Sequence, residues 1–115
     1  MIIAIIGSRN FKDKASVDSV LSKELTSIFN TVITGGAPGV DTWVIDFCKK
    51  NCTLCEIIRP IDPKNKRDYL FRNVEIITKA DKILAFWDGE SKGTKFGIDY
   101  AKARKKDITI YKPEE

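Results

Sequence analysis

Five short apolar runs alternate along the chain with longer stretches in which apolar residues recur every three or four positions. The runs are rich in Ile and Val, as is typical of strands that are buried on both faces of a sheet. They lie at Met1–Ile6, Thr31–Thr34, Thr53–Ile58, Lys82–Phe86 and Asp107–Tyr111. The pattern predicts five parallel strands.

The stretches between the strands have the spacing of amphipathic helices. The apolar positions are Val17, Val20, Leu21, Leu25, Ile28 and Phe29 in the first helix, Val40, Trp43, Val44, Phe47 and Cys48 in the second, Leu70, Val74 and Ile77 in the third, and Ile98 and Ala101 in a shorter fourth. Strict alternation with short connections requires right-handed crossovers and helices on both sheet faces. We therefore expect an α/β fold, a Rossmann-like three-layer sandwich with a five-stranded parallel sheet in the order 3-2-1-4-5. The first strand is placed centrally because its continuous apolar run needs cover on both faces.

Two glycine-containing turns each follow a predicted strand and precede a predicted helix. The first reads Thr34-Gly35-Gly36-Ala37-Pro38-Gly39-Val40-Asp41, and the second reads Asp88-Gly89-Glu90-Ser91-Lys92-Gly93-Thr94. Such turns leave unpaired backbone N–H groups at the positive end of a helix dipole, an arrangement that holds phosphate. One turn alone is equally well explained as a tight connection without a ligand. Two turns that meet Gly7-Ser8-Arg9 at the C-terminal edge of the sheet predict one composite anion site.

Several side chains near these turns are candidates for ligand binding. Arg9 either closes over a phosphate as a bidentate fork or is an exposed loop arginine. Asp41 either interacts with the helix dipole or accepts hydrogen bonds from ribose hydroxyls. Trp87 is expected to pack rather than to serve as a stacking platform. The complete set of expected ligand-binding residues is Gly7, Ser8, Arg9, Gly35, Gly36, Gly39, Asp41, Arg72, Asn73, Asp88, Gly89, Ser91, Gly93 and Thr94.

Arg72 and Asn73 stand in the middle of the third predicted helix, beside core positions. A charge there is unfavourable unless it reaches a partner. The partner of Arg72 is either a ligand or a nearby carboxylate such as Asp68 or Asp88.

Length and charge limit the classes of function. The 115 residues suit a single domain, 1–115, without an internal linker or repeat. The net charge of +4 comes from scattered basic residues, so a nucleic-acid partner is possible but not favoured.

No apolar run approaches the roughly 20 residues that span a bilayer, and no membrane partner is expected. Met1 leads directly into a strand without a secretory signal, which predicts a cytoplasmic protein. A homodimer remains open.

The chain has no histidine and three cysteines, Cys48, Cys52 and Cys55. No second cysteine pair completes a tetrahedral metal site, so we expect reduced thiols, no metal and no other cofactor. No nucleophile–base pair is recognisable either, and catalysis is therefore not favoured.

Four motifs in order resemble the YspA-like branch of the SLOG superfamily. They are Ile6-Gly7-Ser8-Arg9 with Phe11, then Thr34-Gly35-Gly36-Ala37-x-Gly39-Val40-Asp41, then Arg72-Asn73, then Ala80-Asp81-x-x-x-Ala85-Phe86-Trp87-Asp88-Gly89-x-Ser91-x-Gly93-Thr94. The superfamily includes the DprA recombination mediators and the LOG-type cytokinin-activating phosphoribohydrolases. The resemblance implies a Rossmann-like fold and a bound nucleotide or nucleotide-derived ligand, in some members as a sensor within antiviral systems.

The chain departs from the hydrolases of that superfamily. Their motif Pro-Gly-Gly-x-Gly-Thr-x-x-Glu carries the catalytic glutamate, and alignment of its Gly-Thr with Gly93-Thr94 puts Gly97 at that position. Asp99 lies two residues on and is turned by about 200° around a helix, so it cannot substitute. The segment Arg59–Arg67 is also short and lacks the tryptophan-bearing loop common in the branch.

The sequence thus favours a domain that binds or senses a nucleotide-derived small ligand through its glycine-rich turns. Two alternatives remain. One is a phosphoribohydrolase-like enzyme that cleaves an N-glycosidic bond, with Asp41, Asp88 or Asp99 as its acid. The other is a DprA-like module that binds single-stranded DNA.

Overall fold

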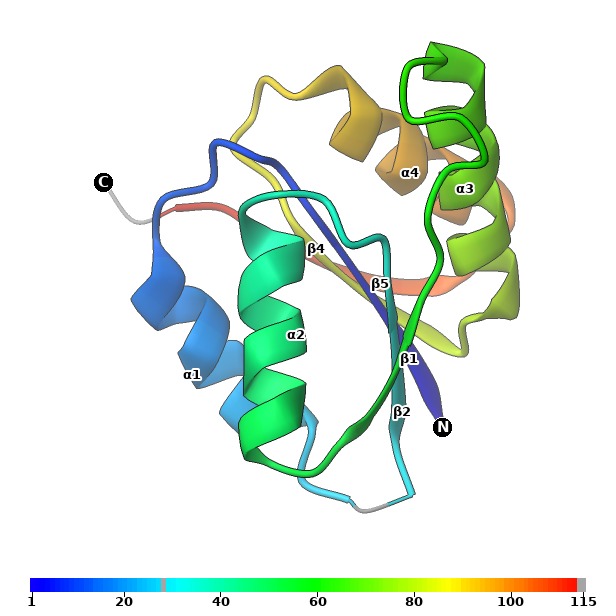
Figure 1. The fold of residues 1–115 in the computed structure, drawn as a ribbon. Helices are drawn as coiled ribbons and strands as arrows, with labels where there is room; N and C mark the ends of the chain where they lie inside the picture. Colours follow the sequence, from blue (N-terminus) through cyan, green and yellow to red (C-terminus); the bar gives the residue numbers. More distant parts are fainter. Residues whose placement is uncertain (28, 114–115) are drawn as a thin grey trace.

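The computed structural model describes residues 1–27 and 29–113 and has the expected alternation of strands and helices (Figure 1). The elements are β1 (Ile2–Gly7), α1 (Lys14–Glu24), β2 (Thr31–Thr34), α2 (Val40–Lys50), β3 (Leu54–Ile57), α3 (Lys66–Lys79), β4 (Lys82–Phe86), α4 (Lys92–Ala103) and β5 (Asp107–Tyr111). The strands form one parallel sheet in the order β3-β2-β1-β4-β5. The predicted Rossmann-like fold is confirmed.

The central strand β1 is buried on both faces and divides the core in two. Ile3 and Ile5 point to the side covered by α1 and α2, and Ala4 and Ile6 point to the side covered by α3 and α4. Figure 1 shows these two pairs of helices on opposite sides of the sheet. The alternation follows from the two-residue period of a strand, and it explains why the whole run is apolar.

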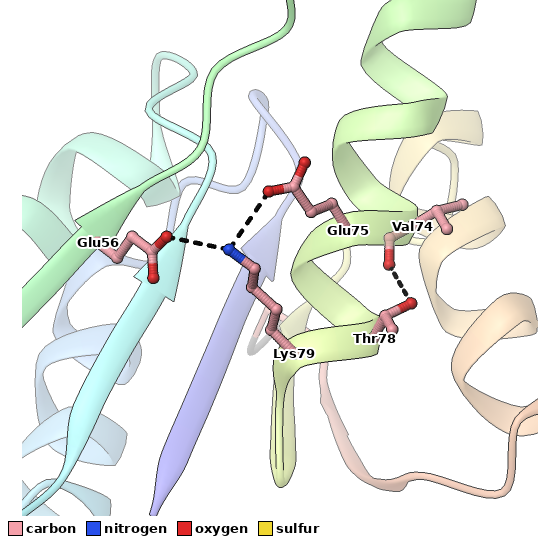
Figure 2. A network of polar contacts seen from close by, with 5 residues as sticks. All are labelled: Glu56, Val74, Glu75, Thr78 and Lys79. Carbon is pink, nitrogen blue, oxygen red and sulfur yellow. Dashed lines mark hydrogen bonds and ion pairs between the residues drawn. The ribbon is translucent and has the colours of Figure 1, made fainter.

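β3 does not fit the prediction of a strand buried on both faces. It lies at the edge of the sheet, and its first residue, Leu54, is 69% exposed. The helix that follows, α3, packs against α4 and β1 and leaves this edge uncovered. Figure 2 shows the ion pair that joins α3 to β3: Lys79 of α3 lies 3.3 Å from Glu56 of β3, and it also pairs with Glu75, one turn earlier in α3, at 3.4 Å. These exposed ion pairs stabilise the edge little compared with a packed apolar face.

The first helix is shorter than its apolar spacing predicts. α1 ends at Glu24, and the N–H of the capping residue Leu25 donates to the carbonyl of Leu21. A turn follows in which the Ser27 hydroxyl accepts the N–H of Phe29, and Phe29 is 82% exposed. Ile28, which was also assigned to this helix, lies outside the described residues.

The third helix follows the predicted apolar stripe only in its second half. Ile77 is buried as predicted, and so is Ile76, which the prediction did not include. Val74 is half-buried, Leu70 is exposed, and the buried residue near Leu70 is Arg72. The inner face of α3 is polar in its first half because that half borders a cleft rather than the core. A search for apolar periodicity therefore selected the wrong side of these turns.

No helix within the described part of the chain is long and apolar enough to cross a membrane.

The close approach of α2 to the end of β1 gives a first test. A Cβ atom on Gly7 would lie 2.5 Å from Cβ of Val40, the first residue of α2. We expect Gly7→Ala to lower the free energy of unfolding by about 1–3 kcal/mol, because α2 or β1 must shift to accommodate the methyl group. Urea denaturation followed by circular dichroism measures the change.

Gly93→Ala is the matched control, because a Cβ there meets no atom within 4 Å. Its stability should equal that of the parent protein or slightly exceed it. Equal stability of the two variants would contradict the packing of α2 against β1.

Candidate functional site

A cleft of about 430 Å³ opens where β1, β2 and β4 end. The residues that line it come from those three strand ends and from the facing sides of α3 and α4, as expected for an open parallel sheet. They are Ile6, Gly7, Arg9, Asn10, Gly35, Ala37, Asp41, Tyr69, Arg72, Asn73, Ile76, Asp88, Glu90, Ser91, Gly93 and Thr94.

The cleft unites most of the residues predicted for the site, from four separate parts of the chain. Those that line it are Gly7, Arg9, Gly35, Asp41, Arg72, Asn73, Asp88, Ser91, Gly93 and Thr94, whereas Ser8, Gly36, Gly39 and Gly89 do not. Sequence reasoning missed Ile6, Asn10, Ala37, Tyr69, Ile76 and Glu90. Tyr69 was detectable in principle, because it precedes Arg72 by three positions on a helix and so shares its face.

The side chain of Asp88 stabilises the turn before α4 by hydrogen bonds to the backbone. The Asp88 carboxylate accepts the N–H groups of Ser91, at 2.8 Å, and Glu90, at 2.9 Å. These two donors, Ser91 first, hold the pKa of Asp88 below that of an ordinary aspartate. The buried Ser8 hydroxyl accepts the Asp88 N–H at 3.2 Å, so Ser8 supports the turn from behind instead of facing the cleft.

The N-terminus of α4 points into the cleft with donors to spare. The first N–H groups of a helix have no partner within it. Ser91 Oγ accepts the N–H of Thr94 at 3.5 Å, which leaves those of Lys92 and Gly93 without an intrahelical acceptor. Gly93 lines the cleft, and the space beside its Cα is open. An anion can approach this backbone closely.

In the turn before α2, a carboxylate of the protein occupies one of the backbone donors. Asp41 Oδ2 accepts the N–H of Ala37 at 3.0 Å. Asp41 is buried, and burial raises its pKa; the Ala37 N–H, the nearby Thr34 hydroxyl and the Arg72 guanidinium act in the opposite direction. Within the described residues, Asp41 Oδ1 and Thr34 Oγ1 are buried without a hydrogen bond of good geometry. Asp41 thus closes this turn from inside.

Two glycines of the same turn shape it from outside the cleft. Gly36 has φ +72°, and a Cβ there would lie 2.6 Å from Nη1 of Arg59, on the side facing away from the cleft. Gly39 has φ +91° and lies close to the backbone of Arg9. A Cβ added at Gly39 would be 2.8 Å from the carbonyl oxygen of Arg9. Both positions require a left-handed backbone, which glycine adopts without strain.

Arg72 donates hydrogen bonds to a backbone carbonyl and to the side chain of the next residue. Its Nη1 donates to the carbonyl of Gly35 at 2.6 Å, and its Nε donates to Asn73 Oδ1 at 2.9 Å. Neither Asp68 nor Asp88, the carboxylates considered from the sequence, fills this role. Burial lowers the pKa of Arg72, and the negative charge of Asp41 partly offsets this effect.

A tyrosine lies between two guanidinium groups on the α3 side of the cleft. The ring centre of Tyr69 is 5.6 Å from Cζ of Arg9 and 5.2 Å from Cζ of Arg72. Both distances lie within the range of cation–π attraction. Among the described residues every ion pair uses a lysine, so neither arginine has a carboxylate within 4 Å. The two guanidinium groups therefore stand side by side without an ion pair to the described residues, and the nearby charge of Asp41 offsets the burial of Arg72 only in part.

The remaining chemistry-bearing residues lie elsewhere. Cys48 is buried, Cys52 exposed and Cys55 intermediate; all three are free, and none lines the cleft. Within residues 1–27 and 29–113 no cluster of three or more His, Cys, Asp or Glu side chains could hold a metal ion. Trp87 packs against the core beside α4, and its Nε1 donates to the carbonyl of Ser91, in line with the packing role expected of it.

Comparison with solved structures finds the same fold in DNA processing proteins. A DNA processing protein A from Helicobacter pylori, described for its single-stranded DNA binding mode, matches with a TM-score of 0.77 at 20% identity, over 96% of this chain and 64% of that one. The DprA protein of Streptococcus pneumoniae matches with a TM-score of 0.79 at 15% identity, over 94% of this chain and 49% of that one. The protein TM1055 matches with a TM-score of 0.69 at 19% identity, over 93% of this chain and 71% of that one.

These likenesses show the fold. The chain spans about two thirds of the length of the first protein and half that of the second. Neither a protein-family profile nor a curated protein matches the sequence.

Burial of Asp41 has a measurable consequence for stability. Because its pKa is raised in the folded protein, the folded state binds more protons than the unfolded state just above pH 3.8, the ordinary aspartate value. The contribution of Asp41 to stability is therefore greatest below this value and falls as pH rises through the folded pKa. Asp41→Asn removes the titration.

We expect the stability difference between the parent protein and Asp41→Asn to shift in favour of the parent as pH is lowered from 7 to about 4. Urea unfolding of both proteins across this range measures it. A difference that is constant, or that shifts toward the variant on acidification, would show that Asp41 is not desolvated.

Proposed function

We propose that this chain binds a nucleotide or nucleotide-derived ligand in the cleft, and that it belongs to the YspA-like branch of the SLOG superfamily. One observation carries the proposal: a helix N-terminus with spare N–H donors and two arginines that form no ion pair within the described residues face one cleft. Phosphate satisfies both kinds of group at once. A cytoplasmic location accompanies the proposal.

The two glycine turns then have different roles. The turn before α2 is closed by Asp41, so the phosphate is assigned to the turn before α4, beside Gly93. Arg9 follows β1 and lines the same cleft, where its guanidinium is available to a phosphate oxygen. The expected phosphate site thus combines the α4 N-terminus with Arg9.

The rest of the cleft suits a sugar and a ring. Ile6 and Ile76 provide apolar wall, Tyr69 an aromatic side chain, and Asn73 an amide group. A few polar groups among apolar and aromatic ones are typical of small-molecule sites, and the volume lies at the lower end of the usual range of about 300–1,000 Å³. A mononucleotide is of suitable size.

The alternative of an N-glycosidic hydrolase is weakened by the positions of the carboxylates. A Cβ at Gly97 would lie 2.9 Å from Cδ1 of Ile6, so the helix packs tightly where the hydrolases carry glutamate. Asp99 pairs with Lys95 at 2.7 Å and does not line the cleft. Asp88 lines the cleft, and its lowered pKa makes it a poor proton donor at neutral pH. Asp41 also lines the cleft and has a raised pKa, but it is buried and its Oδ2 is held by the Ala37 N–H.

Single-stranded DNA is the second candidate because a protein of the same fold is described as binding it. The unpaired arginines would serve a DNA backbone as well as a free nucleotide. The two ligands differ in salt dependence, since DNA binding through several phosphates weakens steeply between low and moderate salt.

Ligand linkage tests the proposal directly. A ligand at 100 times its dissociation constant stabilises the folded state by about 2.7 kcal/mol. We expect at least one of a panel of nucleotides, NAD, ADP-ribose and cyclic nucleotides to raise the melting temperature by roughly 10–20 °C, at about 4–8 °C per kcal/mol. Inorganic phosphate should raise it far less, because it occupies one part of the cleft. A shift with single-stranded DNA and none with the panel would replace this proposal by the second candidate.

Substitution at Gly93 tests the assignment of the phosphate. Gly93→Val places a side chain on the backbone that an anion must approach, in space that is open in the folded protein. We expect the ligand-induced shift to be largely lost, with little change in the melting temperature without ligand. Lys102→Ala, on the same helix and away from the cleft, is the control and should keep the full shift. Undiminished binding by Gly93→Val would exclude this turn from the site.

A further inference from the structure

A second depression adjoins the cleft on the far side of Arg72. It has a volume of about 60 Å³, and Arg59, Ile61 and Phe71 are among the residues that line it. Arg72 lines both hollows, so one side chain separates them. Figure 1 shows the segment between β3 and α3, which carries Arg59 and Ile61, running beside α3.

Large apolar side chains stand exposed at this depression. Phe71 is 66% exposed and Ile61 is 96% exposed. Exposed apolar residues are common singly, but two of them at the rim of one hollow, next to a polar cleft, indicate a surface that a ligand covers. The hollow is too small to enclose a ring, so a ring would lie flat across its rim against Phe71.

The guanidinium groups mark a path between the two hollows. Arg9 and Arg72 flank Tyr69 in the cleft, and Arg59 lies close enough for its charge to act on Arg72. Arg59 Nη1 donates to the carbonyl of Gly36 at 3.3 Å, and within the described residues no carboxylate lies within 4 Å of any of the three guanidinium groups. The charges of Arg9 and Arg59 both act unfavourably on that of Arg72, Asp41 opposes this effect, and an anion would bridge the three guanidinium groups directly. A ligand with two or more linked phosphates would do so.

We propose that the cleft and the depression form one extended site for a ligand with two nucleoside groups joined through phosphates, with one ring in the cleft and the second stacked on Phe71. The inference rests on the proposed function and extends it by naming the class of ligand. Stacking of a base on an aromatic side chain tolerates different bases. The second subsite therefore adds affinity more than it selects a base.

Matched ligands test the second subsite. ADP and diadenosine diphosphate share one adenosine and the phosphate pair, and GDP and diguanosine diphosphate form the equivalent guanine pair. We expect the two-nucleoside member of at least one pair to bind the parent protein about 5- to 100-fold more tightly, as measured by calorimetry. Phe71→Ala should remove this advantage and leave the affinity for the nucleoside diphosphate unchanged. Phe71→Tyr should retain it.

Leu70→Ala is the control variant, because Leu70 is the preceding residue on α3, is exposed, and does not line the depression. It should behave as the parent protein does. Melting temperatures of all variants without ligand establish that they are folded.

The outcomes separate the two proposals. If a nucleoside diphosphate binds and its two-nucleoside partner binds no better, or if Phe71→Ala weakens both equally, the second subsite is wrong and the proposed function stands. If neither member of either pair binds while a single-stranded oligonucleotide does, both proposals are wrong.

Discussion

The structure depends on the burial of β1 from both sides. Because successive residues of a strand point to opposite faces, the run from Ile3 to Ile6 contributes to two cores at once. Two cores require helices on both sides of the sheet, and parallel strands then require crossovers through those helices. The ends of β1, β2 and β4 consequently meet at one edge of the sheet. The cleft is the place where these connections diverge, and its position follows from the packing of the central strand.

At that edge the protein uses similar turns in different ways. In the turn before α2, Asp41 accepts the Ala37 N–H and is buried, and this carboxylate lies near the guanidinium of Arg72. Arg72 in turn donates to the carbonyl of Gly35 and so ties α3 to the end of β2. The turn before α4 is held by Asp88, and the N–H groups of Lys92 and Gly93 have no acceptor within their helix. A carboxylate thus occupies backbone donors in both turns, and the open space beside Gly93 leaves the second turn accessible to an anion.

The α3 side of the cleft, like the turn before α4, has polar groups that the described part of the protein leaves without a full set of partners. Tyr69 contacts two guanidinium groups, but an aromatic ring offsets like-charge repulsion far less than a carboxylate does. Burial makes this arrangement less favourable still for Arg72. Neither arginine forms an ion pair within the described residues, so a bound phosphate would give both guanidinium groups a charged partner. Structural relatives at 15–20% identity share the fold of this chain, so the site residues carry the functional argument.

Much of the fold and of the candidate site could be predicted from the sequence, and there are physical reasons why the other features could not. Strand positions, strand order and the meeting of Arg9, Arg72 and Gly93 at one edge follow from local patterns, because period and turn chemistry are properties of neighbouring residues. The exposed edge of β3, the rotation of α3 that turns Leu70 outward, and the displacement of Gly36 from the cleft depend on which surfaces lie against each other. Tyr69 lies on the helix face of Arg72 and was therefore accessible from the sequence together with it. The capture of the Ala37 N–H by Asp41 could not be deduced, because a carboxylate at that position suits the helix dipole, a ribose or its own turn equally well. Only the folded chain shows that bond, since burial and hydrogen-bond geometry are set by all the surrounding elements together, and the ribose contact of Asp41 stays a prediction.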